Sequence, residues 1–216
     1  MVLIDILRSF LFCFKHLPFT QAVKLPVLIT SNVGKIDIKG RILLQADPVK
    51  RYQVIIGRSG SEALQSFKAG IYVKKGGCLK FGGSAVIGEG TVLRVDEDAN
   101  LEIGDRFYCN KNCYIRCSKS IQIGSRVTFG WNNTLNDTDG HTISYEGGEK
   151  HNNCGCIRIG EHVWITTNCF INKDAAIPDE SVVALGSVVN RLNAKPHTLI
   201  GGVPAKVLKE GIHWQE

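Results

Sequence analysis

Aliphatic residues recur at every sixth position in the last third of the chain, at Ile159, Ile165, Ile171, Ile177, Val183 and Val189. A small or slim residue follows four positions after each of the first five, at Val163, Cys169, Ala175, Ser181 and Ser187. Neither the helical period of 3.6 nor the strand period of 2 produces this grid, whereas the hexapeptide repeats of a parallel β-helix do. Three such rungs make one triangular coil. Stacked coils lie about 4.8 Å apart, so each aliphatic side chain packs on its counterpart one coil earlier.

A second unit, apolar-x-apolar-Gly, marks the coils further upstream. It occurs at 54–57, 79–82, 101–104, 121–124 and 157–160. We expect each unit to open a coil, which predicts roughly seven coils within a β-helix spanning residues 31–192.

The last interval between these units is as long as two coils, and the rung positions inside it cannot build an aliphatic core. Those positions hold His141, Gly147 and Asn153. The segment of about 137–156 is therefore predicted to leave the prism as one long polar, glycine-rich loop. Long loops on a rigid scaffold commonly carry function.

Both ends of the chain predict caps. Residues 1–16 form an amphipathic pattern that Pro18 ends, so residues 1–30 are expected to hold a helix that covers the open end of the β-helix. The same apolar face suits contact with a membrane surface, and the two roles are compatible. Residues 193–216 are predicted to turn, run extended and form a short helical cap beginning near Pro204, with Trp214 tucking the tail back.

Composition and charge narrow the class of protein. With 216 residues, 44% of them hydrophobic, the chain is expected to form one elongated globular domain without a run of apolar residues long enough to span a bilayer. The formal charge of +6 is concentrated near the N-terminus, because residues 1–80 hold 13 Lys and Arg against 4 Asp and Glu. Such a surplus is explained by solubility, by binding to a polyanion or by contact with an anionic membrane surface. We expect peripheral contact with an anionic membrane and no nucleic-acid partner.

The eight cysteines favour a reducing compartment. Cys109 and Cys169 fall on the rung grid and Cys113 at a slim corner position, which is typical of reduced thiols used as small hydrophobic residues. Cys154 and Cys156 lie close to His151, but the spacing is a weak metal motif, and we expect no metal. The predicted location is cytoplasmic, at the inner face of the membrane.

From about residue 36 to 212 the chain resembles the left-handed β-helix, hexapeptide-repeat acyltransferases, and especially the O-acetyltransferases of capsular and lipopolysaccharide glycans. The resemblance rests on four motifs in order: 137–141 (Asp-Thr-Asp-Gly-His), 159–165 (Ile-Gly-Glu-His-Val-Trp-Ile), 185–189 (Leu-Gly-Ser-Val-Val) and 202–206 (Gly-Val-Pro-Ala-Lys). It implies an all-β, left-handed parallel β-helix. It also implies acetyl-CoA as co-substrate, a sugar hydroxyl of a surface glycan or its precursor as acceptor, and a homotrimer with active sites between subunits.

The predicted chemistry needs a base. Acetyl transfer to a hydroxyl removes the hydroxyl proton as its oxygen attacks the thioester, and a neutral imidazole suits this near pH 7. His141 is the candidate base, and either Asp139 or Asp137 is expected to orient its ring and stabilise the imidazolium. His151 and His162 are interpreted as loop and surface residues. A zinc site like that of β-helix carbonic anhydrases is disfavoured, because the sequence has no H-x4-H pair.

The resemblance also implies a path for the coenzyme. Trp164 would lie beside the acyl group and donate its indole N–H toward the thioester oxyanion, although packing between subunits explains it equally well. Thr166 and Gly186 would line the pantetheine path, and Lys206 or Arg191 would meet the phosphates. Thr166 replaces a glycine frequent in the family, which favours acetyl over longer acyl groups.

Two alternatives remain open from the sequence. One is N-acetylation of an amino sugar or another small molecule, since an amine also loses a proton. The other is a non-catalytic β-helix that serves as an assembly subunit.

Overall fold

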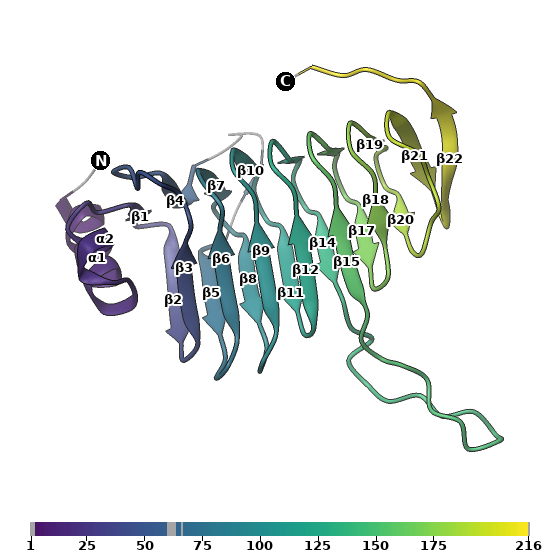
Figure 1. Cartoon of the computed structure of the whole chain (residues 1–216), viewed down its shortest axis with the longest axis horizontal. Coiled ribbons are helices and arrows are strands. Elements are labelled where there is room, and N and C mark those ends of the chain that lie inside the picture. Colours follow the sequence, from purple (N-terminus) through teal and green to yellow (C-terminus); the bar gives the residue numbers. More distant parts are fainter. Residues whose placement is uncertain (1–2, 60–63, 66, 216) are drawn as a thin grey trace.

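The computed structural model describes residues 3–59, 64, 65 and 67–215. The described chain winds into stacked coils along one long axis, with the helices at one end and the chain terminus folded back at the other (Figure 1). Its strands form three sheets, which we call the first, second and third faces of the prism. Each strand pairs in parallel with the equivalent strand one coil away, and the final strand pairs antiparallel. The predicted parallel β-helix is confirmed.

The strands of the three faces alternate along the chain. The first face holds β1 (Val27–Ile29), β4 (Val54–Arg58), β7 (Ala85–Gly88), β10 (Phe107–Cys109), β13 (Thr128–Phe129), β16 (Trp164–Ile165), β19 (Val182–Val183), β21 (Thr198–Gly202) and β22 (Ala205–Glu210). The second face holds β2 (Val33–Ile38), β5 (Ala69–Val73), β8 (Val92–Val95), β11 (Tyr114–Cys117), β14 (Thr134–Asn136), β17 (Phe170–Asn172) and β20 (Val188–Val189). The third face holds β3 (Arg41–Leu44), β6 (Cys78–Phe81), β9 (Asn100–Ile103), β12 (Ser120–Ile123), β15 (Cys156–Ile159) and β18 (Ala176–Ile177).

The aliphatic grid fills the prism as the sequence predicts. Ile159, Ile165 and Ile171 lie on the third, first and second faces, and each is buried. Successive coils superpose these side chains, since Ile159 pairs in register with Ile177. Within the described residues the second face has seven strands, in agreement with the predicted seven coils.

One part of the sequence interpretation was wrong. The unit at 54–57 lies on the first face, in β4, whereas the four later units lie on the third face. Ile56 therefore pairs with Ile87 and not with a residue of the 79–82 unit. The pattern misleads because glycines end strands at more than one corner of the prism, so apolar-x-apolar-Gly does not identify a particular face.

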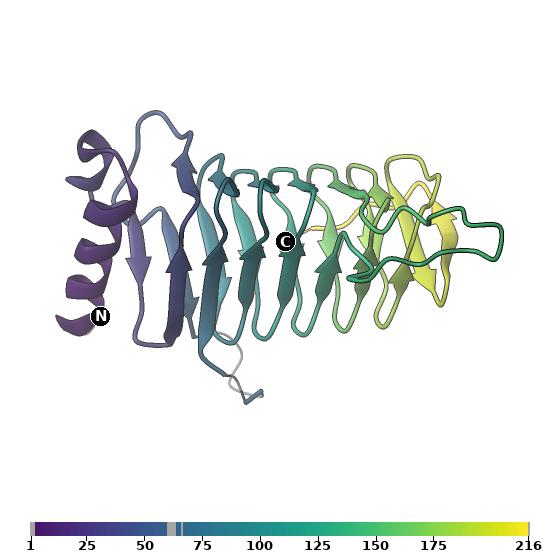
Figure 2. The same ribbon diagram turned by 90° about the horizontal axis from the view of Figure 1, so that it is seen from below.

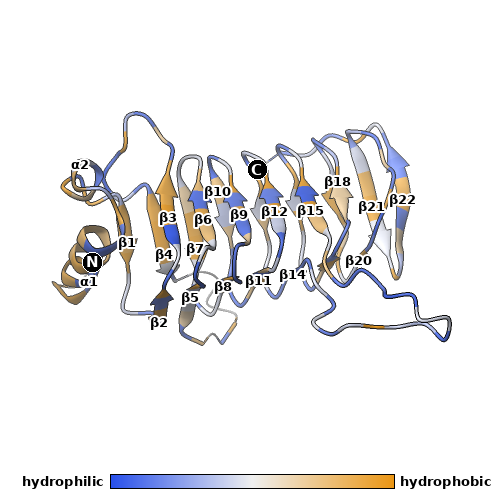
Figure 3. Cartoon of the chain, turned by 60° about the horizontal axis from the view of Figure 1, so that its bottom comes forward, coloured by the Kyte–Doolittle hydropathy of each residue, from blue (hydrophilic) through white to orange (hydrophobic). Residues whose placement is uncertain are grey.

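The excursion loop, residues 137–155, leaves the prism between β14 and β15 and projects well away from the coils (Figure 1). The coil closes without it, because Ile123 of β12 pairs directly with Ile159 of β15. Isolated antiparallel bridges from Thr138 to Cys154 and from Ser144 to Lys150 hold its two arms together. The loop is mainly hydrophilic (Figure 3).

Helices α1 (Leu3–His16) and α2 (Phe19–Ala22) lie across the first coil (Figure 2). The inner face of α1 covers the core with Phe12 and Cys13, so the predicted cap is present. The edge of β1 is also covered, because the Ile29 N–H donates to the Ser9 hydroxyl at 2.8 Å. Among the described helices, none is long and apolar enough to cross a membrane.

The predicted C-terminal helix near Pro204 is wrong. Residues 205–210 instead form β22, which pairs antiparallel with β21. A segment this short is marginal as an isolated helix, whereas pairing satisfies the open backbone edge of the last strand. The tail beyond β22 does fold back as expected, since the Trp214 indole N–H donates to the His162 carbonyl at 3.0 Å.

Candidate active site

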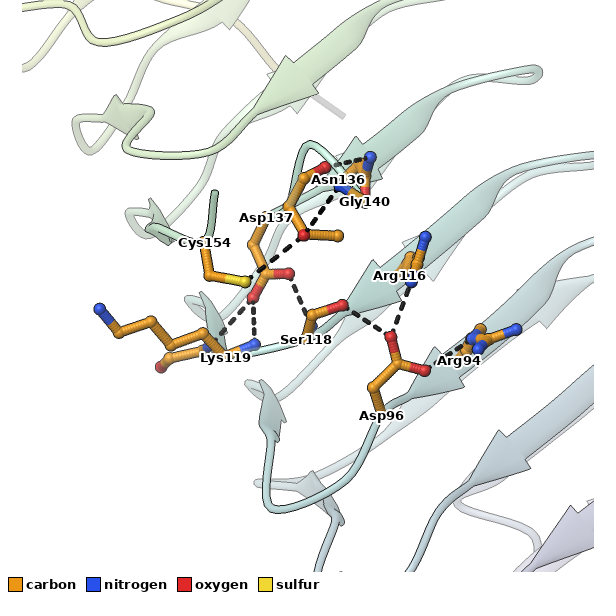
Figure 4. Close-up of polar contacts among 11 residues, drawn as sticks. Arg94, Asp96, Arg116, Ser118, Lys119, Asn136, Asp137, Gly140 and Cys154 are labelled. Carbon is orange, nitrogen blue, oxygen red and sulfur yellow. Dashed lines mark hydrogen bonds and ion pairs between the residues drawn. The ribbon is translucent and has the colours of Figure 1, made fainter. Parts of the chain in front are cut away.

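The start of the excursion loop is fixed by a buried carboxylate. Asp137 is fully buried, and it accepts hydrogen bonds from the backbone N–H groups of Ser118 at 2.6 Å, Lys119 at 2.8 Å and Ser120 at 2.9 Å (Figure 4). These three donors belong to the preceding corner of the prism. The carboxylate of Asp137 is therefore occupied as an anchor for the loop, and no contact joins it to His141 within the described structure.

A second polar cluster stabilises the base of the loop. Asp139 forms an ion pair with Lys173 and lies 3.2 Å from His151 Nε2. The other ring nitrogen of His151, Nδ1, lies 3.1 Å from the Tyr145 hydroxyl. The structure thus brings Asp139 together with His151 rather than with His141. Sequence spacing gave no signal for this contact, because it depends on how the two arms of the loop pair.

His141 lies exposed on the first arm of the loop. Neither a hydrogen bond nor an ion pair reaches its ring from any residue that the structure describes. Both ring nitrogens are thus available to a substrate. His151 differs, because its two nitrogens already contact Asp139, Lys173 and Tyr145. Of these two loop histidines, only His141 is free to accept a proton from a bound molecule.

Trp164 projects outward from β16 on the first face and is 39% exposed. Its neighbour His162 stacks on Trp214 of the tail, with ring centroids 4.2 Å apart, and Trp214 lies 5.9 Å from Trp164. The Glu180 carboxylate lies 2.6 Å from Nδ1 of His162. The hydrogen bond between them lowers the pKa of the Glu180 carboxyl. The tail therefore builds an aromatic wall beside Trp164, while the Trp164 indole N–H has no partner among the described residues.

The four residues predicted to meet the coenzyme lie in the later coils. The Thr166 hydroxyl donates to the Val183 carbonyl at 2.8 Å, so it turns toward the next coil. Gly186 has a φ of +68° at an open corner, where an added Cβ would meet nothing within 4 Å. Lys206 is exposed on β22, and Arg191 is exposed just after β20. The structure does not gather these four residues into one cluster.

His141 and Trp164 start from different sides of the prism. The loop that carries His141 leaves the corner between the second and third faces, whereas Trp164 projects from the first face. In a triangular prism that corner lies opposite the first face.

The outward surface of the first face is apolar. Paired strands align one outward residue from each coil into what we call the apolar column: Leu28, Ile55, Val86, Tyr108 and, beyond Thr128, Trp164. The third face contrasts with it, because its outward column contains Lys80, Glu102, Gln122 and Arg158. An outward apolar column of this kind is typical of a surface that another surface covers.

A polar cluster that the sequence did not reveal lies on the second face (Figure 4). Asp96 accepts hydrogen bonds from Nε of Arg94 at 2.7 Å, from Nε of Arg116 at 3.0 Å and from the Ser118 hydroxyl at 2.7 Å. Burial acts to raise the pKa of the Asp96 carboxyl, but its three hydrogen bonds together lower it below its ordinary value. Asp96 is therefore ionised at neutral pH, and the two arginines leave the cluster with a net positive charge. We call it the arginine pair.

Comparison with known proteins places this fold in a class. No family model matches the chain. The galactoside O-acetyltransferase of Escherichia coli strain K12 is 36% identical over 115 residues, covering 52% of this chain and 55% of that protein. The sophorolipid acetyltransferase of Starmerella bombicola is 33% identical over 177 residues, covering 80% of this chain and 66% of that protein. The chain thus spans between about half and two thirds of the length of these curated relatives.

The fold comparison agrees. The crystal structure of the polySia-specific acetyltransferase NeuO superposes with a TM-score of 0.63 at 17% identity, covering 88% of this chain and 79% of that one. The β-helix is therefore of the left-handed, hexapeptide type, as predicted. The chain belongs to the left-handed β-helix, hexapeptide-repeat acyltransferases.

Proposed function

We propose that this protein transfers an acetyl group from acetyl-CoA to a hydroxyl of a sugar in a surface glycan or its precursor. The observation that carries the proposal is His141, an exposed imidazole with both nitrogens free of contacts from the described residues, on the excursion loop of a hexapeptide-repeat acyltransferase. The sugar oxygen attacks the thioester carbonyl and its proton passes to His141. The carbon–sulfur bond breaks, and His141 returns the proton to the departing thiolate.

The two aspartates support this base in different ways. Asp137 fixes the loop through its three backbone hydrogen bonds, so it acts on the position of His141 rather than on its charge. Asp139 is partly exposed and lies two positions before His141, and its carboxylate is paired with Lys173 and His151. It is the carboxylate of the two that stabilises a protonated His141 once the loop packs against a neighbouring subunit.

We infer a homotrimer in which the loop of one subunit reaches the first face of the next. The opposed positions of His141 and Trp164 support this arrangement, as does the apolar column that includes Trp164. In a closed ring of this kind each subunit gives a loop and receives one, so every copy takes part in two sites. The indole N–H of Trp164 then donates toward the oxyanion formed during acetyl transfer.

Coenzyme A is proposed to lie along the later coils at the same interface. Its pantetheine arm would pass Gly186 and the corner formed by Thr166, and exposed Lys206 or Arg191 would bind its phosphates. The Thr166 hydroxyl donates to the adjacent coil, and its side chain, bulkier than glycine, is proposed to limit the width of this path. This favours acetyl over longer acyl groups.

The test is an assay of thiol release from acetyl-CoA with a panel of sugars, amino sugars and oligosaccharides, alongside direct measurement of coenzyme A binding. Release that depends on a hydroxyl acceptor is the expected result. Release only with amine acceptors would replace the proposal with N-acetylation. Failure to bind coenzyme A would favour a non-catalytic assembly subunit.

We also infer that the N-terminal helices rest on an anionic membrane from the cytoplasmic side. The outer side of α1 and α2 exposes large apolar residues: Leu3, Ile4, Leu7, Phe10, Leu11, Phe14, Phe19 and Val23. Figure 3 shows this apolar end of the molecule. Exposed cations surround it, among them Lys15, Lys24 and Lys35. An apolar face with a basic rim suits an interface rich in anionic lipid.

Flotation with lipid vesicles tests the membrane proposal. The protein should float with phosphatidylglycerol-containing vesicles and much less with pure phosphatidylcholine. Leu11→Glu should abolish flotation, whereas Val207→Glu, at the other end of the prism, should not. Equal flotation with both kinds of vesicle, or none with either, would contradict the proposal.

A further inference from the structure

The arginine pair occupies the outward surface of the second face. Arg94 of β8 and Arg116 of β11 pair in register on neighbouring coils, and Asn136 of β14 follows in the same column. The excursion loop begins at the next residue, Asp137. The backbone positions of Arg116 and Arg94 therefore lie about one and two coils, or roughly 5 Å and 10 Å, from the origin of the loop that carries His141.

Two like charges in register on adjacent strands destabilise a sheet, so their retention requires an explanation. Asp96 compensates one of the two charges and ionises readily. It contacts each guanidinium through Nε alone, and the terminal NH2 groups of both arginines have no partner among the residues described. These planar groups match the two oxygens of a carboxylate. Asp96 therefore holds the arginines in place while their terminal donors face outward.

The positive surface continues away from the loop. Arg94 also lines a hollow at the corner between the second and third faces, together with Lys39, Lys74, Lys75, Asp96 and Glu97. Lys74 lies 3.7 Å from Asp37. Because this ion pair is partly exposed to solvent, it cancels little of the positive potential of the hollow. The hollow contains four cations against two carboxylates, so its field attracts anions. It accounts for part of the N-terminal charge surplus.

Aromatic side chains flank the arginine pair. Tyr72 precedes Arg94 in the same column, and Tyr114 lies beside Arg116 on β11. Both rings are partly exposed. Such rings offer an apolar surface and a polar hydroxyl, a combination that suits the faces of sugar rings. One ring in the column of the two arginines and one in the column beside it fit a chain of sugars that carries negative charges.

We propose that the acceptor is an acidic glycan, whose carboxylates bind the arginine pair and the adjoining lysine hollow while one of its hydroxyls lies at His141. This inference rests on the proposed function and names its substrate class. It commits to carboxylated sugars because the cations with free terminal donors that lie nearest the loop on this face are two planar guanidinium groups, whereas Lys173 at the base of the loop is paired with Asp139. The lysines further away add attraction that salt screens.

The experiment compares acidic oligosaccharides with their own carboxyl methyl esters, which keep the sugar and remove the charge. Oligogalacturonate, hyaluronan fragments and oligosialate are titrated into the protein by calorimetry at low and physiological salt. At least one acid should bind at least about tenfold more tightly than its ester, as expected for charge-assisted hydrogen bonds. Arg94→Gln and Arg116→Gln should each remove about that factor.

Arg158→Gln is the matched control, because Arg158 is an exposed arginine on the third face, away from the arginine pair and the lysine hollow. It should leave glycan binding unchanged. All three variants should keep coenzyme A binding, the oligomer mass and the melting temperature of the unchanged protein. The proposal is overturned if no acid binds more tightly than its ester, if the Arg94 and Arg116 variants bind normally, or if they change the oligomer mass. Coenzyme A binding that persists in any of these cases leaves the proposed acetyl transfer standing.

Discussion

The coils and the excursion loop of this protein obey different physical rules. In the coils, Ile159 and Ile177 occupy equivalent positions because identical aliphatic side chains stack in one column. In the loop, hydrogen bonds and ion pairs decide the conformation, chiefly through Asp137 at its start and Lys173 at its base. The coils therefore tolerate exchanges among small aliphatic residues, whereas single polar atoms govern the loop. Stability resides mainly in the first region, and the proposed chemistry in the second.

The largest expected effect separates the two loop histidines. His141→Ala should lower kcat/KM for acetyl transfer by about 10²–10⁴-fold, the usual contribution of a positioned general base. His151→Ala removes a ring whose nitrogens are already occupied, and it should cost far less. Steady-state kinetics with an active acceptor measures both. If His151→Ala is the more damaging change while coenzyme A binding persists, the base is His151 and not His141.

The next effect compares a buried anchor with an exposed carboxylate. Asp137→Ala leaves three buried N–H donors without an acceptor and should lower the free energy of unfolding by about 3 kcal/mol or more. Asp139→Ala breaks partly exposed pairs and should cost at most about 1 kcal/mol. Urea denaturation at neutral pH checks the difference. Equal losses for the two variants would mean that Asp137 does not anchor the loop.

A smaller effect concerns alkaline pH and belongs to the coils. Burial raises the pKa of the thiols of Cys13, Cys109 and Cys117. In the unfolded chain these thiols ionise near pH 8.5, whereas in the folded chain they stay protonated, so their contribution to stability is complete below that pH and falls above it. In this pH range each fully buried thiol should lower the free energy of unfolding by up to about 1.4 kcal/mol per pH unit.

Denaturation under reducing conditions between pH 7.5 and 9.5 measures this loss. Cys117→Val replaces a buried thiol with an aliphatic residue of similar size and should reduce the slope of stability against pH. A flat profile for the unchanged protein would contradict the assignment.

The smallest effect concerns the C-terminal cations. Lys206→Ala should raise the KM for acetyl-CoA about two- to fivefold and leave kcat unchanged, because an exposed ion pair contributes up to about 1 kcal/mol. Lys209, on the same exposed strand, is the matched control and should have less effect when changed to Ala. A fall in kcat for Lys206→Ala, without a change in KM, would exclude a role in phosphate binding.

These contrasts also explain what the sequence could reveal. The buried position of Ile171 and the break in the repeat at His141 were predictable, because a six-residue repeat, and the point where it stops, can be read directly from the sequence. The contact between Asp139 and His151 and the register of Arg94 with Arg116 were not, because both depend on how separate segments pair. The helix expected near Pro204 failed for the same reason: the open edge of β21 offered 205–210 a better partner than its own backbone.

The central claim is that each active site is shared between two subunits, and mixing two inactive variants tests it most directly. His141→Ala lacks the base, and Trp164→Ala lacks the indole on the opposite side of the prism, each expected to lose at least about 100-fold in rate. Co-expressed in equal amounts, they should assemble mixed trimers in which one interface pairs an intact His141 with an intact Trp164. With random assembly, half of the loops keep His141 and half of the receiving faces keep Trp164, so about a quarter of the interfaces hold both. Activity should then recover to about a quarter of that of the unchanged protein. Mixed oligomers no more active than either variant alone would contradict the shared site.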